Sequence, residues 1–335
     1  MTQILVTGAT GFLGRHVIHT LLGTGAPLAC PIRILSRSGN PWPNDPRVEH
    51  VGGDITDATA VRKAVAGAGV VLHLAGLVKR DPGSADAMRR THVEGTRNVC
   101  EAALGAPATR IVVASSSGTV AVSRDPVVHT ESAPYATGVV DHWPYYLSKI
   151  EQEKLALAYH EEGKLDVVVL NPSILLGPGD IHRSSTDDVR AFLDRRIPNV
   201  PSGGLNFVDA RDTARAFVSA IDRGRGGQRY LIGGHNMTIR AFFGFLERIS
   251  GVRAPRLVLP ERIARGGAAF LRRAYAIAGG RFPLDDASIE MAYRYWYCDS
   301  ALAQKELGFE ARPGDETLRD TVGFIRNEAG TKPGR

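Results

Sequence analysis

A tyrosine and a lysine four residues apart, in HWPYYLSKIE (142–151), are the residues of this chain best suited to acid–base chemistry. On a helix, Tyr145 and Lys149 share one face, with Cβ atoms about 5–6 Å apart. A nearby ammonium favours the phenolate, so we expect Lys149 to lower the pKa of Tyr145 from about 10 toward neutral pH. Such a phenol can protonate a carbonyl oxygen while hydride reaches the carbon, or take the proton in reverse.

The neighbours of this pair decide which tyrosine is used. Tyr146 is rotated about 100° around the helix, so we expect it to pack as a core or rim aromatic. Pro144 suits the first helical turn and lets the helix begin just before Tyr145. The serines 115–117 end an apolar run, where a hydroxyl can polarise the same carbonyl oxygen.

A glycine-rich stretch, VTGATGFLGRHV (6–17), follows the first apolar run and opens a helical pattern. Gly8 permits a tight turn, Gly11 lets a pyrophosphate approach the backbone, and Gly14 lets helix and strand pack closely. The helix N-terminus then faces the phosphates of a dinucleotide. We expect cofactor contacts from Gly8, Thr10, Gly11, Phe12, Leu13 and Gly14.

The choice of cofactor should be made at the end of the second strand, in ILSRSGN (34–40). An acid there would hold the ribose 2′-hydroxyl of NAD, but Ser36 takes this place and Arg37 follows. A guanidinium can bind a 2′-phosphate, so the stretch favours NADP(H), with NAD(H) possible. The alternative is that Arg37 stacks on the adenine or is solvated.

Short apolar runs alternate with helical patterns through the first half of the chain. We expect strands at 4–7, 32–35, 70–75, 110–116 and 166–170. We expect helices between them at 11–23, 57–66, 85–104 and 144–162. Unbroken Val- and Ile-rich strands are typical of parallel sheets covered on both faces. The sequence therefore predicts an α/β fold, a Rossmann-type doubly wound parallel sheet.

The pattern changes after Leu170. A Pro/Gly-rich loop at 171–180 precedes a polar helix near 186–194, and Asp209 or Asp212 can cap the helix that follows NFVD. We expect further helices at 238–250, 259–279, 299–306 and 314–328. The prediction is a Rossmann core at 1–170, completed by about 205–232, and a smaller, mostly helical substrate lobe. That lobe comprises 171–204 and 233–335.

Composition argues against several classes of protein. The 335 residues are 43% hydrophobic and 23% charged, as in globular proteins. The net charge of +6 comes without a dense run of basic and aromatic residues, so we expect no nucleic-acid partner. Cys30, Cys100 and Cys298 are far apart, which predicts reduced thiols and a cytoplasmic location.

We expect no metal, because His16 and His19 lack acidic or thiol partners. We expect no signal peptide, and no apolar run approaches the roughly 20 residues that span a bilayer. The stretch 262–280 predicts an amphipathic helix that covers the core or a partner subunit. The alternative is peripheral contact with a membrane or an apolar substrate.

Taken together, these motifs resemble the extended short-chain dehydrogenase/reductase superfamily, which includes the NAD-dependent epimerase/dehydratase family. Within it the chain is most similar to the dihydroflavonol-4-reductase-like branch and the neighbouring hopanoid-associated sugar epimerases. The stretches that carry the resemblance are TGATGFLG (7–14), GDITD (53–57), HLAG (73–76), HVEGTRNV (92–99), ASSSGTV (114–120), YYLSK (145–149), NPSILLGPGD (171–180), FVDARDTARA (207–216), RYLIGGHNMTIR (229–240) and YCDSALAQKELGF (297–309).

The resemblance implies roles for particular residues. Tyr145 would be the catalytic acid/base and Lys149 its partner, also holding the nicotinamide ribose. The catalytic serine would be Ser116 by similarity to reductases, or Ser117 by similarity to sugar epimerases. Further cofactor contacts would come from Asp54 and Ile55 at the adenine, Leu74, Ala75 and Gly76 at the ribose, and Pro172 and Ser173 at the nicotinamide. The family usually has Asn where this chain has His92, a replacement from which we expect little change beyond local hydrogen bonding.

We therefore expect an NADPH-preferring oxidoreductase that reduces a ketone or aldehyde to an alcohol. Leu77 and Val78 would line a partly apolar substrate site, with the loops 121–143 and 177–185. One alternative is an NAD-dependent nucleotide-sugar epimerase or dehydratase, against which weigh Ser36 and the lack of an obvious acid/base pair beside the serines. A non-catalytic cofactor sensor is the other alternative, although such proteins usually lose the Tyr–Lys pair. The fold often forms homodimers through helices equivalent to 85–104 and 144–162.

Overall fold

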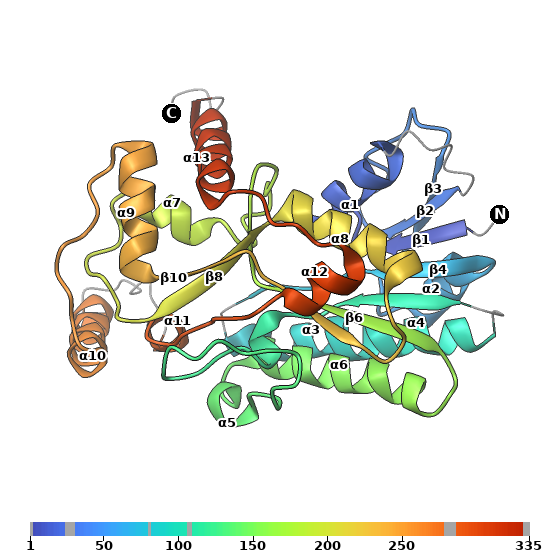
Figure 1. Cartoon of the computed structure of the whole chain (residues 1–335), viewed down its shortest axis with the longest axis horizontal. Coiled ribbons are helices and arrows are strands. Elements are labelled where there is room, and N and C mark those ends of the chain that lie inside the picture. The colour runs from blue at the N-terminus through green and yellow to red at the C-terminus, as the bar shows by residue number, and fades with distance from the viewer. Residues whose placement is uncertain (1–2, 24–30, 80–81, 106–108, 278–285, 331–335) are drawn as a thin grey trace.

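The core is a seven-stranded parallel sheet in the order β3-β2-β1-β4-β5-β6-β9, seen in the computed structural model (Figure 1). The structure describes residues 3–23, 31–79, 82–105, 109–277 and 286–330. The central strands are mostly apolar and almost completely buried after their first residue, because helices cover both faces of the sheet. The predicted fold class is confirmed.

The strands of this sheet are β1 (Gln3–Thr7), β2 (Ile32–Ser36), β3 (Val48–Gly52), β4 (Ala68–His73), β5 (Arg110–Ala114), β6 (Asp166–Pro172) and β9 (Arg229–Ile232). The helices packed on it are α1 (Phe12–Gly23), α2 (Ala58–Val65), α4 (Gly95–Leu104), α6 (Pro144–Glu161), α8 (Ala210–Arg223) and α12 (Ala301–Leu307). Short helical turns are Pro82–Ser84, α3 (Ala85–Arg89), a π-helical turn at Arg90–Glu94, Ser117–Thr119 and α5 (Thr137–Val140).

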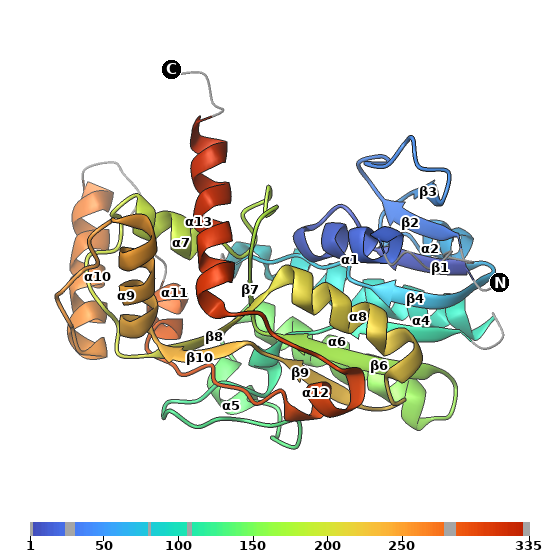
Figure 2. The ribbon, with the colours of Figure 1, turned by 45° about the horizontal axis from the view of Figure 1, so that its top comes forward.

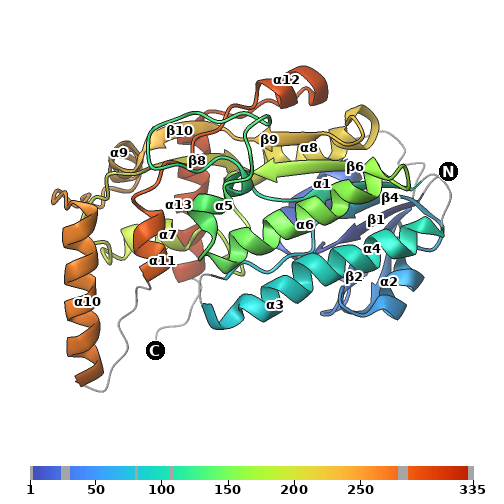
Figure 3. The same ribbon diagram turned by 90° about the horizontal axis from the view of Figure 1, so that it is seen from below.

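Each face of the sheet is covered by its own hydrophobic cluster. One cluster joins the strands to α1, α8 and α12, and includes Val17, Leu21 and Phe217. The other joins them to α2, α4 and α6, and includes Val61 and Ala156. Figure 3 shows α4 and α6 side by side across the second face. A homodimer through these helices stays a prediction.

A second lobe is built on a three-stranded sheet in the order β10-β8-β7. Its elements are β7 (Ile174–Leu176), α7 (Asp187–Leu193), β8 (Gly204–Asp209), β10 (His235–Thr238), α9 (Ile239–Ser250), α10 (Glu261–Ile277), α11 (Asp286–Met291) and α13 (Gly314–Gly330). A third cluster, with Phe192, Phe243 and Leu318, fills the space between this sheet, α7, α9 and α13. Figure 2 shows α13 standing beside α9, with α10 at the outer end of the lobe.

The observed elements differ from the predicted ones mainly in the short strands. The sequence patterns did not predict β3 or β10, and the expected loop 171–180 instead holds the end of β6 and the strand β7. Because β8 joins the second sheet, β9 is the strand that completes the main sheet in the 205–232 region. Of the two predicted capping residues, Asp209 and Asp212, it is Asp209 that caps α8, because its side chain accepts from the Arg211 N–H. The boundary between core and lobe stays a prediction.

No helix in the described ranges is long and apolar enough to cross a membrane. The outer helix α10 nevertheless exposes Ile263, Phe270 and Ile277, with 74% of Phe270 accessible. Peripheral membrane contact of α10 stays a prediction. Cys100 and Cys298 are buried free thiols, and Cys30 lies outside the described residues.

Candidate active site

The glycine-rich turn between β1 and α1 is packed too tightly for side chains at two of its glycines. Gly8 has φ +70°, and a Cβ there would lie 2.6 Å from the Ala75 nitrogen. A Cβ on Gly14 would lie 2.1 Å from the Gly8 carbonyl oxygen, so only glycine allows α1 to begin there. At Gly11 the nearest atom to a Cβ is again the Gly8 oxygen, at 3.2 Å. Gly11 thus keeps the backbone open toward the start of the helix, where an anion binds favourably.

Ser36 and Arg37 lie in the turn after β2, where the adenine end of the cofactor is predicted to bind. Ser36 is buried, and its Oγ donates to the Gly39 carbonyl at 2.7 Å and lies 3.1 Å from His50 Nε2. Ser36 therefore shapes the turn after β2. The Arg37 side chain is 79% exposed, and its only ion-pair partner in the described ranges is Asp54, at 3.5 Å. Its guanidinium remains accessible to a phosphate.

The segments predicted to line the ribose and nicotinamide also follow the ends of strands. Leu74 and Ala75, directly after β4, are tied to Thr7 by bonds of 3.2 Å to its carbonyl and hydroxyl oxygens. Pro172 ends β6, and Ser173 follows it with a buried Oγ that has no hydrogen-bond partner within the part of the chain described. A buried hydroxyl of this kind costs free energy unless a ligand satisfies it.

These observations test whether a nicotinamide dinucleotide fits. The segments after β1, β2, β4, β5 and β6 all lie at the carboxyl edge of the parallel sheet, where such ligands bind in open α/β folds. The glycine turn offers backbone approach at one end, and the unsatisfied Ser173 hydroxyl offers a polar partner at the other. The residues present fit the cofactor.

Tyr145 lies at the first turn of α6, where Pro144 occupies the first position of the helix. The Tyr145 and Ser116 hydroxyl groups are hydrogen-bonded to each other, and the Ser116 oxygen also accepts from the Gly118 N–H at 3.3 Å. Ser117 is buried within the short helical turn that follows. Of the two candidate serines, the structure brings Ser116 to Tyr145.

Lys149 occupies the same face of α6, one turn further on, but its ammonium does not bond the phenol. Its Nζ donates to the Ala114 carbonyl at 2.8 Å and to Gln152 Oε1 at 2.9 Å. Burial lowers the pKa of Lys149 to about 7, although the Glu153 carboxylate opposes this shift. Burial also raises the pKa of Tyr145 to about 12, although the bond with Ser116 opposes it. The expectation of a lowered tyrosine pKa is therefore wrong for this arrangement, because desolvation raises the pKa by more than the bond with Ser116 lowers it.

Sequence reasoning missed Glu153, which lies one turn beyond Lys149 on the same helix. Its completely buried carboxylate accepts from Ser115 Oγ at 2.6 Å and from Asn171 Nδ2 at 2.7 Å, and pairs with Arg229 at 2.7 Å. An acid does therefore lie beside the serines, contrary to expectation, but it is neutralised by Arg229 and holds the serine turn in place. The spacing of four residues from Lys149 was the available signal.

Tyr146 packs as predicted. Its ring lies 5.0 Å from Trp296 and 6.0 Å from Trp143, while Trp143 and Trp296 stack at 5.6 Å. A Cβ on Gly118 would lie 2.3 Å from the Tyr146 ring, so these aromatic rings pack tightly against the serine turn. We call Trp143, Tyr146 and Trp296 the aromatic wall.

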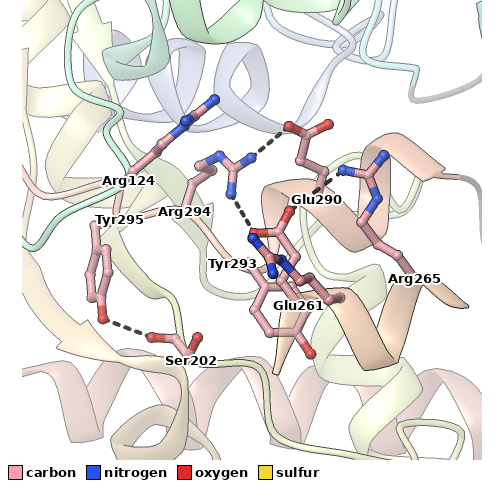
Figure 4. Close-up of a pocket in the computed structure, with 9 residues that line it drawn as sticks. Arg124, Ser202, Glu261, Arg265, Glu290, Tyr293, Arg294 and Tyr295 are labelled. Atoms are coloured by element: carbon pink, nitrogen blue, oxygen red, sulfur yellow. Dashed lines mark hydrogen bonds and ion pairs between the residues drawn. The ribbon is translucent and has the colours of Figure 1, made fainter. Parts of the chain in front are cut away.

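A cavity of about 680 Å³ lies beyond the aromatic wall, between the loop after Ser123 and helices α10 and α11 (Figure 4). It is lined by Arg124, Ser202, Glu261, Arg262, Arg265, Glu290, Tyr293, Arg294 and Tyr295. Backbone bonds between Ser123 and Tyr295 join its two sides, and Glu290 bonds His142, next to the aromatic wall.

The charges of this cavity are mainly basic. The buried Arg294 pairs with Glu261 at 3.1 Å and Glu290 at 2.6 Å, as the dashed lines in Figure 4 show. Its Nε is buried and has no partner among the residues described, and no described carboxylate pairs with Arg124 or Arg262. The predicted substrate residues Leu77 and Val78 do not line this cavity, which is more polar than the expected substrate site.

Comparison with known proteins agrees with this architecture. A sequence model of the NAD dependent epimerase/dehydratase family matches residues 4–233. A Synechocystis sp. protein named provisionally as a dihydroflavonol 4-reductase is 30% identical over 98% of this chain and 95% of its own length. Cinnamoyl-CoA reductase 1 from Oryza sativa subsp. japonica is 31% identical over 95% of this chain and 89% of its own.

One solved structure holds ligands in the same fold. The dTDP-glucose 4,6-dehydratase from Streptomyces venezuelae, with NAD and TYD bound, superimposes with a TM-score of 0.77 and 25% identity over 98% of each chain. The family match covers the phosphate turn, both candidate serines and the Tyr145–Lys149 pair. The chain is thus an NAD(P)-dependent oxidoreductase of the NAD-dependent epimerase/dehydratase family, within the extended short-chain dehydrogenase/reductase superfamily.

Proposed function

We propose that this protein is an NADPH-preferring reductase that converts a ketone or aldehyde to an alcohol at Ser116, Tyr145 and Lys149. The observation that carries the proposal is the Ser116–Tyr145 hydrogen bond at the carboxyl edge of the sheet, one helical turn from Lys149. The two reductase relatives support the direction of the reaction.

The protein's own groups divide the work of the reduction. A bound dihydronicotinamide would supply hydride to the carbonyl carbon. The raised pKa of Tyr145, about 12, keeps its phenol protonated at neutral pH, so it can donate the proton that the carbonyl oxygen needs. The Ser116 hydroxyl, already hydrogen-bonded to that oxygen, can then donate to the phenolate that remains and stabilise it.

Lys149 restores the acid. Its pKa of about 7 makes the ammonium and the neutral amine similarly populated at neutral pH, so a proton can leave it without a large penalty. Its Nζ also lies 3.6 Å from the position of a Cβ on Gly76, in the segment predicted to face the ribose. Lys149 is therefore placed to hold that ribose and to return a proton toward Tyr145.

The preference for NADPH rests on the turn after β2. Ser36 places no carboxylate there, and among the described residues the exposed Arg37 pairs only with Asp54, at 3.5 Å. A 2′-phosphate would replace that long contact with shorter, charge-assisted bonds.

A nucleotide-sugar epimerase or dehydratase is the second candidate, favoured by the basic cavity. Arg124 and Arg262, without ion-pair partners in the described ranges, and the unsatisfied Nε of Arg294 would suit an anionic group on the substrate. The dTDP-glucose 4,6-dehydratase that binds NAD and TYD in the same fold supports this second candidate function.

Cofactor consumption separates the two candidates. Purified protein would be mixed with NADPH or NADH and a panel of ketones and aldehydes, and loss of the reduced nicotinamide followed by absorbance. Turnover with NADPH above NADH supports the reductase. Absence of turnover, together with copurified NAD⁺ and activity on nucleotide sugars, would assign the protein to the second candidate.

A further inference from the structure

His92 connects three parts of the candidate site. It lies on the π-helical turn Arg90–Glu94 between α3 and α4, and its side chain is completely buried. A π-turn widens the helix and shifts the side chains that follow, a distortion often found at functional sites. This turn directs the imidazole into the space between Gly76 and Tyr145.

Two hydrogen bonds define the state of the imidazole. The Leu77 N–H donates to His92 Nε2 at 3.0 Å, and His92 Nδ1 lies 2.8 Å from Ser148 Oγ. A backbone N–H can only donate, so Nε2 must be unprotonated and Nδ1 must carry the hydrogen. The Ser148 hydroxyl, having accepted from Nδ1, donates to the Tyr145 carbonyl oxygen at 2.8 Å.

The ring itself contacts the catalytic candidates. It meets the Tyr145 ring edge to face, with centroids 5.7 Å apart and planes at 77°. A Cβ on Gly76 would lie 3.2 Å from His92 Nε2, so the imidazole fills the space behind the segment predicted to face the ribose. One side chain thus touches the acid and the wall of the cofactor site.

We propose that His92, as a neutral imidazole protonated at Nδ1, is a positioning residue that clamps the Tyr145 turn of α6 to the Gly76–Leu77 loop. The catalytic meaning of the clamp rests on the proposed function, whereas its geometry does not. An asparagine at this position is shorter and carries its donor and acceptor on one amide. It would reach one of the two partners and leave the face of the Tyr145 ring without an aromatic contact.

The surroundings keep the imidazole neutral. Lys149 and Tyr145 face it from α6, and His73 faces it from β4, so no carboxylate among these neighbours stabilises an imidazolium. Burial, followed by the Lys149 ammonium, lowers the pKa of His92 to about 2. Protonation would also break the bond from Leu77.

Nitrogen-15 NMR of histidine-labelled protein tests the state of the ring without any substrate. His92→Phe identifies the resonances by subtraction. We expect the pattern of a neutral ring with hydrogen on Nδ1, unchanged from pH 8 to pH 5. A ring protonated in this range, or hydrogen on Nε2, would overturn the clamp whether or not the protein is a reductase.

Variants then test the positioning role, with His73→Gln as the matched control. His73 is a second completely buried imidazole, but it bonds Thr7 and Thr96 instead of the Tyr145 turn. In His92→Phe and His92→Asn we expect the ¹³Cζ resonance of Tyr145 to move, and kcat on any reducible carbonyl to fall about 10- to 100-fold. The control should leave the Tyr145 resonance in place.

A shift of the Tyr145 resonance in His73→Gln as large as in the His92 variants would mean that any buried imidazole has this effect, which contradicts the proposal. An unmoved resonance in both His92 variants would contradict it as well. If one His92 variant does not fold, the other identifies the His92 resonances by subtraction, and the tautomer in the unaltered protein still decides the question.

Discussion

Burial sets the proton chemistry of the site by favouring the neutral form of both titrating groups. It raises the pKa of Tyr145 to about 12 and lowers the pKa of Lys149 to about 7. The phenol therefore stays protonated at neutral pH, and the lysine is a group that exchanges protons near neutral pH. The hydrogen bond with Ser116 acts in the opposite direction and lowers the pKa of Tyr145.

Replacing each adjacent tyrosine by phenylalanine tests which one supplies the proton. Tyr145→Phe removes the acid, and we expect kcat for carbonyl reduction to fall about 10²- to 10⁴-fold. Tyr146→Phe keeps the ring that packs on Trp143 and Trp296, so kcat should stay within about threefold. Equal losses in the two variants, measured on the same ketone, would contradict the assignment of Tyr145.

Arg37→Ala tests the preference for NADPH. Loss of a charge-assisted bond to phosphate costs roughly 1.5–3 kcal/mol, so we expect the KM for NADPH to rise about 10- to 100-fold. The KM for NADH should change by less than about threefold, because NADH has no 2′-phosphate. Lys63→Ala, which removes a cation from α2, controls for general charge. An equal rise for both cofactors would show that Arg37 does not read the phosphate.

Among the secondary-structure elements, the sequence predicted those whose own residues carry a clear hydrophobic pattern. The apolar runs of β1, β2, β4, β5 and β6 and the helices between them follow the expected ranges closely. The strand β10, HNMT, has no apolar alternation, and it forms because its backbone pairs with β8 about thirty residues earlier. No local pattern encodes such a pairing.

The same distinction holds in the candidate site. The spacing of Tyr145 and Lys149 on one helix was readable, as was the glycine turn. The roles of Glu153 and His92 were not, because their partners Arg229 and Leu77 are distant in sequence. The tyrosine pKa was misjudged because burial depends on the packing of the whole site.

Gly14→Ala tests whether the turn from β1 into α1 is as closely packed as described. The new Cβ would meet the Gly8 carbonyl oxygen at 2.1 Å, and because that oxygen belongs to the backbone and cannot rotate away, the helix must shift. We expect unfolding free energy to fall by about 1–3 kcal/mol and cofactor affinity to fall at least tenfold. Gly23→Ala is the matched control in the same helix, since a Cβ there meets nothing within 4 Å. Cofactor binding by calorimetry that is equal in both variants would contradict the packing.

For the whole molecule, buried histidines predict how stability responds to acid. Burial lowers the pKa of His73 to about 3 and that of His92 to about 2, from an ordinary value of 6.5. Below pH 6.5 the two imidazoles are therefore protonated in the unfolded chain but remain neutral in the folded protein. Stability is full above pH 6.5 and is lost as pH falls from 6.5 toward 3, by about 1.4 kcal/mol per pH unit for each group.

Urea unfolding between pH 7 and pH 4.5 measures this slope. His73→Gln should reduce it by roughly half of the joint contribution of His73 and His92, because one of these two groups no longer titrates. A slope that is the same with and without His73 would show that its imidazole is protonated, or accessible, in the folded state. The window lies above the pKa values of most carboxylates, which act at lower pH.

The proposed reaction is net hydride transfer from NADPH to a carbonyl, with Tyr145 as the acid. It is tested most directly by giving the protein NADPH deuterated on the transferring carbon, together with a carbonyl compound that it turns over. Mass spectrometry would then follow the label in the product. We expect an alcohol that carries one deuterium, one NADP⁺ released per alcohol formed, and loss of this product in Tyr145→Phe. Tightly bound NAD⁺ that is never consumed while a nucleotide sugar is converted would contradict it.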